Sequence, residues 1–409
     1  GLLDSSGQLL GNPVHYRDSR NEGMIEEACK IVPRREIYEH TGIQFLKFNT
    51  LYQLLSLKLS GSPLLEKAKT LLFTPDLLNY FLTGEKVTEY TIASTSQMID
   101  PRKGTWAELI LSRLGIPRDI LLDMVNPGTI IGKISRGVSE DLNVSGIPVV
   151  AVAGHDTASA VMSVPAAEER YAYLSSGTWS LLGVELPEPV INDTTYRLNY
   201  TNEGGFNRTT RLLKNIMGLW IYQECKRTWD KAGEPATFDE LEQMAMESAP
   251  FVAFIDPDDD LFYSPGNMPE KIREFCRKTG QAVPDSKAAI VRCIMESLAL
   301  KYRMAVEGLE RIVGYSIPVL HVVGGGCKNI MLCQFTANAL GRPVVAGPVE
   351  ATAVGNIACQ MIALGEVSGL DEARAIVRNS FPTREYAPKE ADRWSEAYER
   401  FRKVAAVQE

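Results

Sequence analysis

A short buried strand, three consecutive glycines and a helix follow one another in the C-terminal half of the chain, and this order strongly limits the possible folds. Residues 319–323 form an apolar run that ends at three glycines, residues 324–326. Helical apolar spacing then continues through NIMLCQFTANAL, and PVVAG followed by TAVGNIACQMIALG repeats the change from strand to helix. Such alternation is typical of a sheet covered by helices. The sequence therefore predicts an α/β fold.

Two further apolar runs end in glycine-bearing turns. VVAVAGHDTASA leads a buried strand into Gly154, His155 and Asp156, and SSGTWS places Gly177 and Thr178 between two predicted strands. Glycine lets a backbone approach a ligand closely, and N–H groups at such turns can hold phosphate oxygens. Each turn taken alone also fits an ordinary tight turn. The P-loop and GxGxxG patterns are absent, so neither of these common nucleotide motifs is predicted.

Length and composition indicate an ordinary globular protein with two domains. The chain has 409 residues, of which 45% are hydrophobic and 23% charged, and it exceeds the size at which single cores stop growing. SVPAAEER separates two β-rich blocks and predicts domains of residues 1–163 and 164–409. A net charge of −8 disfavours a nucleic-acid partner. Apolar runs stay below the roughly 20 residues of a membrane span, so we expect no membrane partner and a cytoplasmic location.

Asp156 has two possible roles at the start of its predicted helix. An aspartate at such a junction commonly caps the helix by accepting backbone N–H groups. The alternative is a general base that takes a proton from an attacking hydroxyl, with His155 holding the substrate. The chain has only four histidines, which disfavours a zinc site.

Two other segments have a predicted structure but no predicted chemical role at this point. Leucine-rich LLKNIMGLWI predicts the start of a helix that extends from about residue 213 to residue 231. DPDDD, at residues 256–260, has the aspartate spacing of a calcium loop but lacks the glycine and glutamate that such a loop needs. We therefore expect a solvated loop there, and the sequence predicts no protein site for a metal ion.

Several motifs together resemble the FGGY family of carbohydrate kinases. They are HYRDSR, GIQFLKFNTLYQL, GHDTASAV, YLSSGTWSLLGVE, TNEGG, LLKNIMGLWI, LHVVGGGCKN and VVAGPVEATAVGNIACQ, and they extend over essentially the whole chain. The resemblance implies two ribonuclease-H-like domains of the actin and hexokinase superfamily around a cleft. In this arrangement the first domain is the sugar-binding domain and the second is the nucleotide-binding domain.

The resemblance assigns the sugar site residue by residue. The aspartate of the GHD motif is the catalytic base in this family, so Asp156 is expected to deprotonate the sugar hydroxyl. His155 and Thr157 are expected to line the sugar. Gly1, at the head of GLLD, and Asn215, in LKNIMGLW, match two further sugar contacts.

The same resemblance implies an ATP site and a reaction. Thr178, Gln223 and Gly325 match the positions that contact ATP, and ATP with Mg²⁺ is the expected phosphate donor. The implied reaction transfers the γ-phosphoryl group to O1 of L-rhamnulose and gives L-rhamnulose 1-phosphate, a step of L-rhamnose breakdown. A kinase for another ketose, such as L-fuculose or a pentulose, and a non-catalytic sensor of sugar or ATP are the alternatives.

Two further expectations come from the resemblance. Family members begin with a strand and an Asp-x-Gly phosphate hairpin ahead of the segment that contains Gly1, so the first domain is expected to be incomplete at its start. A chain that truly begins at Gly1 is then expected to have little kinase activity. The resemblance also implies a cysteine pair at Cys276 and Cys293, whereas a reducing cytosol favours free thiols.

Overall fold

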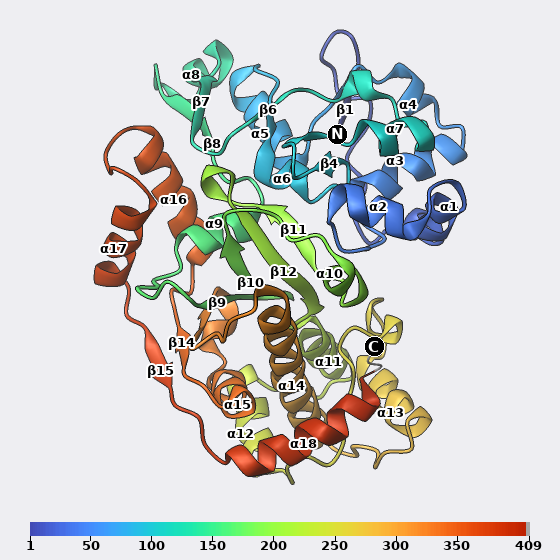
Figure 1. Cartoon of the computed structure of the whole chain (residues 1–409), viewed down its shortest axis with the longest axis vertical. Coiled ribbons are helices and arrows are strands. Elements are labelled where there is room, and N and C mark those ends of the chain that lie inside the picture. The colour runs from blue at the N-terminus through green and yellow to red at the C-terminus, as the bar shows by residue number, and fades with distance from the viewer. Residues whose placement is uncertain (406–409) are drawn as a thin grey trace. The chain divides into compact units, whose positions relative to one another are not determined.

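Helices and strands alternate through residues 1–405, the part of the chain that the computed structural model describes, and this confirms the α/β class (Figure 1). Two units each pack around a core of their own. The first unit comprises Gly1–Ser163, Glu185–Leu213 and Thr352–Ala375, and the second comprises Val164–Val184, Lys214–Ala351 and the chain from Ile376 onward. Two of the boundaries fall inside strands β10 (Trp179–Leu186) and β12 (Thr210–Met217), so the chain passes between the units within these strands.

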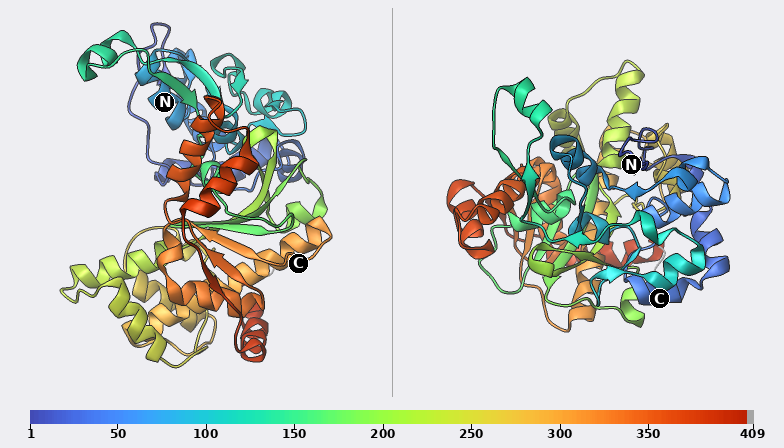
Figure 2. Two further views of the ribbon diagram at one scale, coloured as in Figure 1. Left: turned by 90° about the vertical axis from the view of Figure 1, so that its left-hand side faces the viewer. Right: turned by 90° about the horizontal axis from the view of Figure 1, so that it is seen from above.

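The first unit is mainly helical. Its helices are α1 (Met24–Ile31), α2 (Arg34–Thr41), α3 (Thr50–Leu59), α4 (Pro63–Lys67), α5 (Thr74–Thr83), α6 (Tyr90–Ser94), α7 (Glu108–Leu114), α8 (Arg136–Leu142), α9 (Asp156–Met162) and α10 (Asp193–Arg197), with most of α16 (Ala351–Ala363) and the first half of α17 (Leu370–Ser380). Its short strands pair as β1 (Leu2–Leu3) with β2 (Thr70–Leu71), β3 (Thr88–Glu89) with β6 (Met124–Val125), β4 (Ile99–Asp100) with β5 (Thr105–Trp106), and β7 (Thr129–Lys133) with β8 (Pro148–Ala151). Figure 2 shows the connection between β7 and β8 that carries α8.

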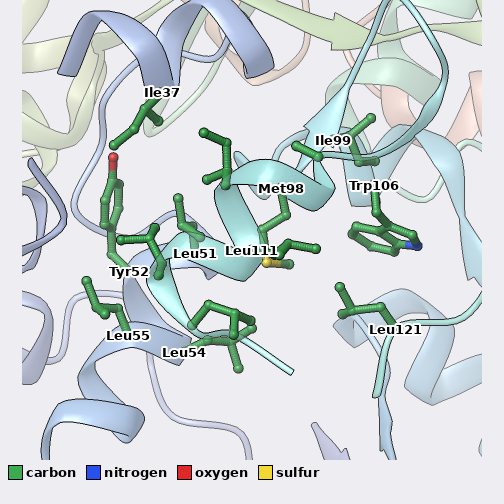
Figure 3. Close-up of a cluster of buried hydrophobic side chains, with 14 of the residues drawn as sticks. Ile37, Leu51, Tyr52, Leu54, Leu55, Met98, Ile99, Trp106, Leu111 and Leu121 are labelled. Atoms are coloured by element: carbon green, nitrogen blue, oxygen red, sulfur yellow. The ribbon is translucent and has the colours of Figure 1, made fainter. Parts of the chain in front are cut away.

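A large apolar cluster of the first unit lies around α3 (Figure 3). Side chains from α2, α3, α7 and the β4–β5 pair point toward one another there, and the labelled ones are Ile37, Leu51, Tyr52, Leu54, Leu55, Met98, Ile99, Trp106, Leu111 and Leu121. The indole N–H of Trp106 donates to Leu122 O at 2.8 Å, so this ring is buried without an unsatisfied polar atom. The apolar residues of FNTLYQLLSLKL recur at helical spacing and form α3, which supplies four of these residues.

The second unit contains most of a seven-stranded sheet. The strand order is β11-β12-β10-β9-β13-β14-β15, with β9 (Ala172–Ser176), β11 (Thr201–Gly204), β13 (Leu320–Val323), β14 (Val344–Ala346) and β15 (Arg384–Tyr386) joining β10 and β12. β13 is parallel to both of its neighbours, β9 and β14. The helices of the second unit are α11 (Trp220–Lys231), α12 (Phe238–Glu247), α13 (Met268–Lys278), α14 (Lys287–Val313), α15 (Ile330–Leu340) and α18 (Ala391–Val404).

The longest helix of the second unit is α14, and helices α12, α15 and α18 pack against it (Figure 1). Ser286 caps its start by accepting the N–H of Ala289 at 3.2 Å, and Gly314 ends it with a φ of 75°. The predicted sequence of strand, glycines, helix, strand and helix is also confirmed, as β13, a 3-10 turn at Gly325–Lys328, α15, β14 and α16. α16 and α17 lie side by side (Figures 1 and 2), where Ala358 and Ala373 share one apolar cluster.

The prediction of one helix from residue 213 to residue 231 is wrong in its first part. Residues up to Met217 belong to β12, and α11 begins only at Trp220. Leu213 pairs with Thr201 of β11 in an antiparallel register. Pairing with a neighbouring strand therefore overrides the helix propensity of the leucines in LLKNIM, as tertiary contacts commonly do.

Candidate active site

The turn that carries Asp156 is held by a buried carboxylate from another part of the first unit. Gly154 N–H donates to Glu89 Oε2 at 2.9 Å. His155 N–H donates to Thr91 Oγ1 at 3.2 Å, and this hydroxyl in turn donates to Glu89 Oε2 at 2.6 Å. A Cβ at residue 154 would lie only 3.1 Å from the same oxygen, so the close approach favours glycine. Glu89 thus positions the backbone directly before Asp156.

Asp156 presents an exposed carboxylate at the start of α9. The structure places His155 at the N-cap, so Asp156 is the first helical residue rather than the cap. Its side chain is 77% exposed, and Oδ1 accepts the backbone N–H of Thr157 at 2.6 Å. The Thr157 hydroxyl donates to the same oxygen at 3.3 Å. A carboxylate that is oriented in this way and open to solvent can take a proton from a bound hydroxyl.

The ring of His155 contacts charged groups on two strands. Its Nδ1 lies 2.9 Å from Arg211 Nη2 on β12 and 3.4 Å from Glu203 Oε2 on β11. Its Nε2 lies 3.6 Å from Asp156 Oδ1. Burial, followed by the positive charge of Arg211, lowers the pKa of His155 below its ordinary value. The imidazole is therefore uncharged at neutral pH.

Gly1 is linked to this turn through the start of α5. Its nitrogen donates to Leu72 O at 2.7 Å, and its carbonyl accepts Leu72 N–H at 3.0 Å. Helix α5 begins two residues after Leu72, and Pro75 lies in its first turn. Pro75 packs against Gly154, because a Cβ added at Gly154 would lie 3.3 Å from the Pro75 Cβ. The segment that contains Gly1 therefore packs next to the element that contacts the turn before Asp156.

α16 packs against α9 at very close range. A Cβ at Gly355 would lie 1.7 Å from the backbone oxygen of Ser159, so only glycine fits there. The Thr352 hydroxyl donates to the backbone oxygen of Asp156 at 3.3 Å. The position of α9, and with it that of Asp156, depends on this contact.

We expect Gly355→Ala to destabilise the protein by about 1–3 kcal/mol, because the added methyl group forces α9 and α16 apart. Any reaction that uses the Asp156 carboxylate should slow as well, since Asp156 lies in the first turn of α9. Urea unfolding and initial rates measure the two effects. The matched control is Gly137→Ala in α8, where a Cβ meets nothing within 4 Å, and an equal loss in both variants would contradict the expectation.

Thr178 and Gln223 are brought together in the second unit. The turn between β9 and β10 contains Thr178, whose carbonyl accepts Gly218 N–H at 3.1 Å and Trp220 N–H at 3.2 Å. A Cβ at Gly218 would lie 2.9 Å from the Gly177 carbonyl, so the two backbones touch. The Thr178 hydroxyl donates to Gln223 Oε1 at 3.4 Å. The start of α11 is thereby fixed against the Thr178 turn.

Gly325 lies at the same edge of the sheet. It follows β13, which is parallel to β9, so the loops after both strands leave at one edge. A Cβ at Gly326 would lie 1.9 Å from Ser176 Oγ at the end of β9, whereas a Cβ at Gly325 would meet nothing within 4 Å. Gly325 is exposed. The three predicted ATP residues are therefore carried by elements that are packed together at this edge.

Asn215 lies in the second unit, half-buried on β12, two residues before Met217. The other residues predicted to contact sugar belong to the first unit. They are Gly1, His155, Asp156 and Thr157.

The DPDDD segment is not wholly a solvated loop, so that prediction is wrong for part of it. Lys301 of α14 is almost completely buried, and its Nζ lies 2.6 Å from Asp256 Oδ1 and 3.1 Å from Asp258 Oδ2. Asp258 also accepts the N–H of Met217 at 2.9 Å. Burial and the neighbouring Lys301 ammonium lower the pKa of Lys214 to about 8. The sequence alone could not predict the ion pairs of Lys301, because they form only when α14 lies beside this loop.

Residues 1–405 contain no group of three or more histidine, cysteine, aspartate or glutamate side chains arranged to hold a metal ion. Within the same described range, no helix is both long enough and apolar enough to cross a membrane. Cys276 and Cys293 are both buried and are present as free thiols.

Sequence reasoning missed three residues that contact Gly154 or His155, namely Glu89, Glu203 and Arg211. Glu203 belongs to the TNEGG motif, which marked this segment as part of the family resemblance. The motif did not indicate which residues Glu203 contacts. Glu89 lies in a segment without a recognisable pattern. Its role follows only from its contact with Gly154, 65 residues later.

Comparisons with known proteins identify the family of the chain. Models of the N-terminal and C-terminal domains of the FGGY family of carbohydrate kinases match residues 1–163 and 172–364. The chain is 46% identical over 401 residues to the rhamnulokinase of Bacteroides thetaiotaomicron, covering 98% of this chain and 82% of that one. It is 40% identical over 392 residues to the rhamnulokinase of Bacillus subtilis, covering 96% and 80%.

Solved structures show the same fold. A ligand-bound xylulose kinase from Lactobacillus acidophilus superposes with a TM-score of 0.81 at 17% identity, covering 98% of this chain and 81% of that one. Plasmodium falciparum glycerol kinase with ADP gives 0.77 at 17% identity, with 98% and 81% covered. The predicted kinase fold with two ribonuclease-H-like domains is therefore confirmed. The chain belongs to the FGGY family of carbohydrate kinases.

Proposed function

We propose that the protein transfers the γ-phosphoryl group of ATP to O1 of L-rhamnulose and gives L-rhamnulose 1-phosphate and ADP. The observation that carries the substrate is the similarity to rhamnulokinases, at 46% identity over 98% of this chain in one case. The exposed carboxylate of Asp156 supports the chemistry, because phosphoryl transfer to an alcohol needs a base at the attacking hydroxyl. The product suits a role in L-rhamnose breakdown.

Asp156 acts as the base in this mechanism. Its carboxylate takes the proton of the sugar O1 hydroxyl while O1 forms a bond to the γ-phosphorus of ATP. The bond between that phosphorus and the β–γ bridging oxygen breaks, and ADP leaves with the electron pair. His155, Thr157, Gly1 and Asn215 hold the sugar so that O1 is in line with this bond, since positioning supplies much of the rate.

Thr178, Gln223 and Gly325 bind ATP. The Thr178 turn and the loop around Gly325 leave one edge of the sheet and offer backbone N–H groups and a hydroxyl to phosphate oxygens. Mg²⁺ would enter with the nucleotide and would neutralise charge on its phosphates. It commonly keeps several waters and needs only one or two protein carboxylates, so the absence of a three-residue cluster among residues 1–405 is compatible with it.

Residues 1–163 form the sugar-binding domain and residues 164–409 the nucleotide-binding domain in this proposal, and the two family-model matches support the division. A sugar and ATP are the partners. The cytoplasm, where ATP and a phosphorylated sugar are both retained, is the proposed location.

The test is ATP-dependent phosphorylation of a panel of acceptors, namely L-rhamnulose, L-fuculose, L-xylulose, D-xylulose and glycerol. We expect kcat/KM to be highest for L-rhamnulose by at least about tenfold, since one well-placed hydroxyl contact contributes about 1.4 kcal/mol or more. Preference for another ketose would correct the substrate and leave the kinase assignment in place. Binding of ATP and sugar without turnover by the whole natural chain would favour a sensor and contradict the proposal.

A further inference from the structure

The TNEGG motif places a carboxylate directly opposite an arginine in the first unit. Glu203 on β11 and Arg211 on β12 are partners in the antiparallel register. Arg211 has no exposed side-chain surface, and its Nη2 donates to Glu203 Oε2 at 3.2 Å. Its Nε donates to Gly204 O at 2.9 Å, so the guanidinium is held at two points. A buried arginine tied in this way cannot easily reorient.

The same Nη2 atom lies 2.9 Å from Nδ1 of His155. A guanidinium has only N–H donors and does not lose its proton in proteins, so Nδ1 must be the acceptor in this contact. An imidazole whose Nδ1 accepts is neutral and carries its proton on Nε2. The contact with Arg211 therefore determines the tautomer of the ring.

The other charged groups that face the ring do not reverse this result. Glu203 Oε2 lies 3.4 Å from Nδ1, farther than Arg211 Nη2, and it already accepts from the guanidinium. Asp156 Oδ1 lies 3.6 Å from Nε2, on the side where the proton is expected. Burial and Arg211 lower the pKa of His155 in spite of both carboxylates.

We propose that Glu203 and Arg211 are positioning residues that hold His155 as its neutral Nε2–H tautomer, so that the ring donates a hydrogen bond to an oxygen of the bound sugar. This inference rests on the proposed function. An oxygen that accepts from Nε2–H is within reach of the Asp156 carboxylate, because the two side chains are adjacent. The hydroxyl is thereby turned so that its own proton points to the base.

Glu203 has a second, electrostatic role beside His155. Its negative charge offsets that of Arg211, so no net positive charge is left beside Asp156. A positive charge there would stabilise the carboxylate and make it a weaker base. The pair thus fixes the tautomer without weakening the base.

Nuclear magnetic resonance of protein labelled with ¹⁵N-histidine tests the tautomer directly. The chain has only four histidines, and loss of one set of ring signals in His155→Asn assigns the set of interest. In the whole wild-type protein without substrate at pH 7, we expect His155 to show a protonated Nε2 and an unprotonated Nδ1. A protonated Nδ1, or two protonated nitrogens, in the set assigned to His155 would overturn the proposal.

Arg211→Met should reverse the state of the ring. Without the guanidinium, Glu203 can accept a hydrogen bond from Nδ1–H, and burial still keeps the ring neutral, so we expect a protonated Nδ1 and an unprotonated Nε2 at pH 7. The KM for the sugar should rise about tenfold while the KM for ATP stays unchanged, since one hydrogen bond to the sugar is lost. Unchanged ring signals in a folded variant would refute the role of Arg211.

Arg208→Met is the matched control, because Arg208 is an exposed arginine in the connection between β11 and β12, three residues before Arg211. It should leave the His155 signals in place. The ring signals are recorded without substrate, so the state of His155 is measured independently of phosphorylation. A wrong tautomer and a missing activity are therefore separate results. A protein that keeps the Nε2–H tautomer but does not phosphorylate L-rhamnulose contradicts only the proposed function.

Discussion

Asp156→Asn is expected to lower kcat for sugar phosphorylation by about 10²–10⁴-fold, which is the contribution typical of a general base. Asparagine has the same shape, and its amide oxygen can still accept the N–H of Thr157, now 2.6 Å from Oδ1. The start of α9 should therefore stay intact. What is lost is the group that can take a proton from the sugar hydroxyl.

The measurement is kcat and KM for L-rhamnulose and for ATP in both proteins. We expect both KM values to change by less than about threefold, since an interaction needed only in the transition state affects kcat rather than ground-state binding. Asp371→Asn serves as the control, because Asp371 is also an exposed aspartate in the first turn of a helix, α17. Turnover by Asp156→Asn within tenfold of wild type would exclude Asp156 as the base.

Asp76→Asn should change how stability depends on pH. Asp76 is fully buried in α5, with Oδ1 accepting the N–H of Glu89 at 3.2 Å and Oδ2 without a hydrogen-bond partner among the described residues. Burial, and then repulsion from the Glu89 carboxylate, raises the pKa of Asp76 to about 8. An aspartate in an unfolded chain has a pKa of about 3.9, so the folded protein binds this proton more tightly.

The sign of the effect follows from that difference. The contribution of Asp76 to stability is fully present below about pH 4 and is lost as the pH rises through about 8. The slope is about 1.4 kcal/mol per pH unit, so this group alone removes up to about 3 kcal/mol between about pH 5.5 and about pH 7.5. Asparagine does not titrate. The free energy of unfolding of Asp76→Asn should therefore increase relative to wild type as the pH rises.

Urea unfolding at a series of pH values measures this difference. Asp119→Asn, which removes an exposed aspartate of the same unit, should give a curve nearly parallel to that of wild type. A parallel curve for Asp76→Asn as well would show that Asp76 is already ionised in the folded protein at low pH.

Local order along the chain was predictable wherever one pattern was long or sharply ended. The apolar stripe of residues 287–313 specified α14 because helical periodicity over many turns has no competing structure. The change from apolar strand to glycines also located the loops that carry Asp156 and Gly325. In each case the information lies within a few neighbouring residues.

The secondary structure of short apolar segments was less predictable. LLKNIM has helix-forming leucines but becomes β12, because its pairing with β11 satisfies the backbone better than an isolated helical turn. The aspartates at 256 and 258 looked solvated because their partner, Lys301, is more than 40 residues away.

The sequence by itself therefore determined the fold class, the family and the identity of the carboxylate at the head of α9. Only the tertiary structure decided what surrounds that carboxylate. Glu89 reaches Gly154 across 65 residues, and Arg211 reaches His155 across 56. Contacts of this kind leave no periodic trace in the chain, because each depends on one side chain whose direction is set by the packing of separate elements. The protonation of His155 is decided in the same way, by a buried arginine that folding places beside it.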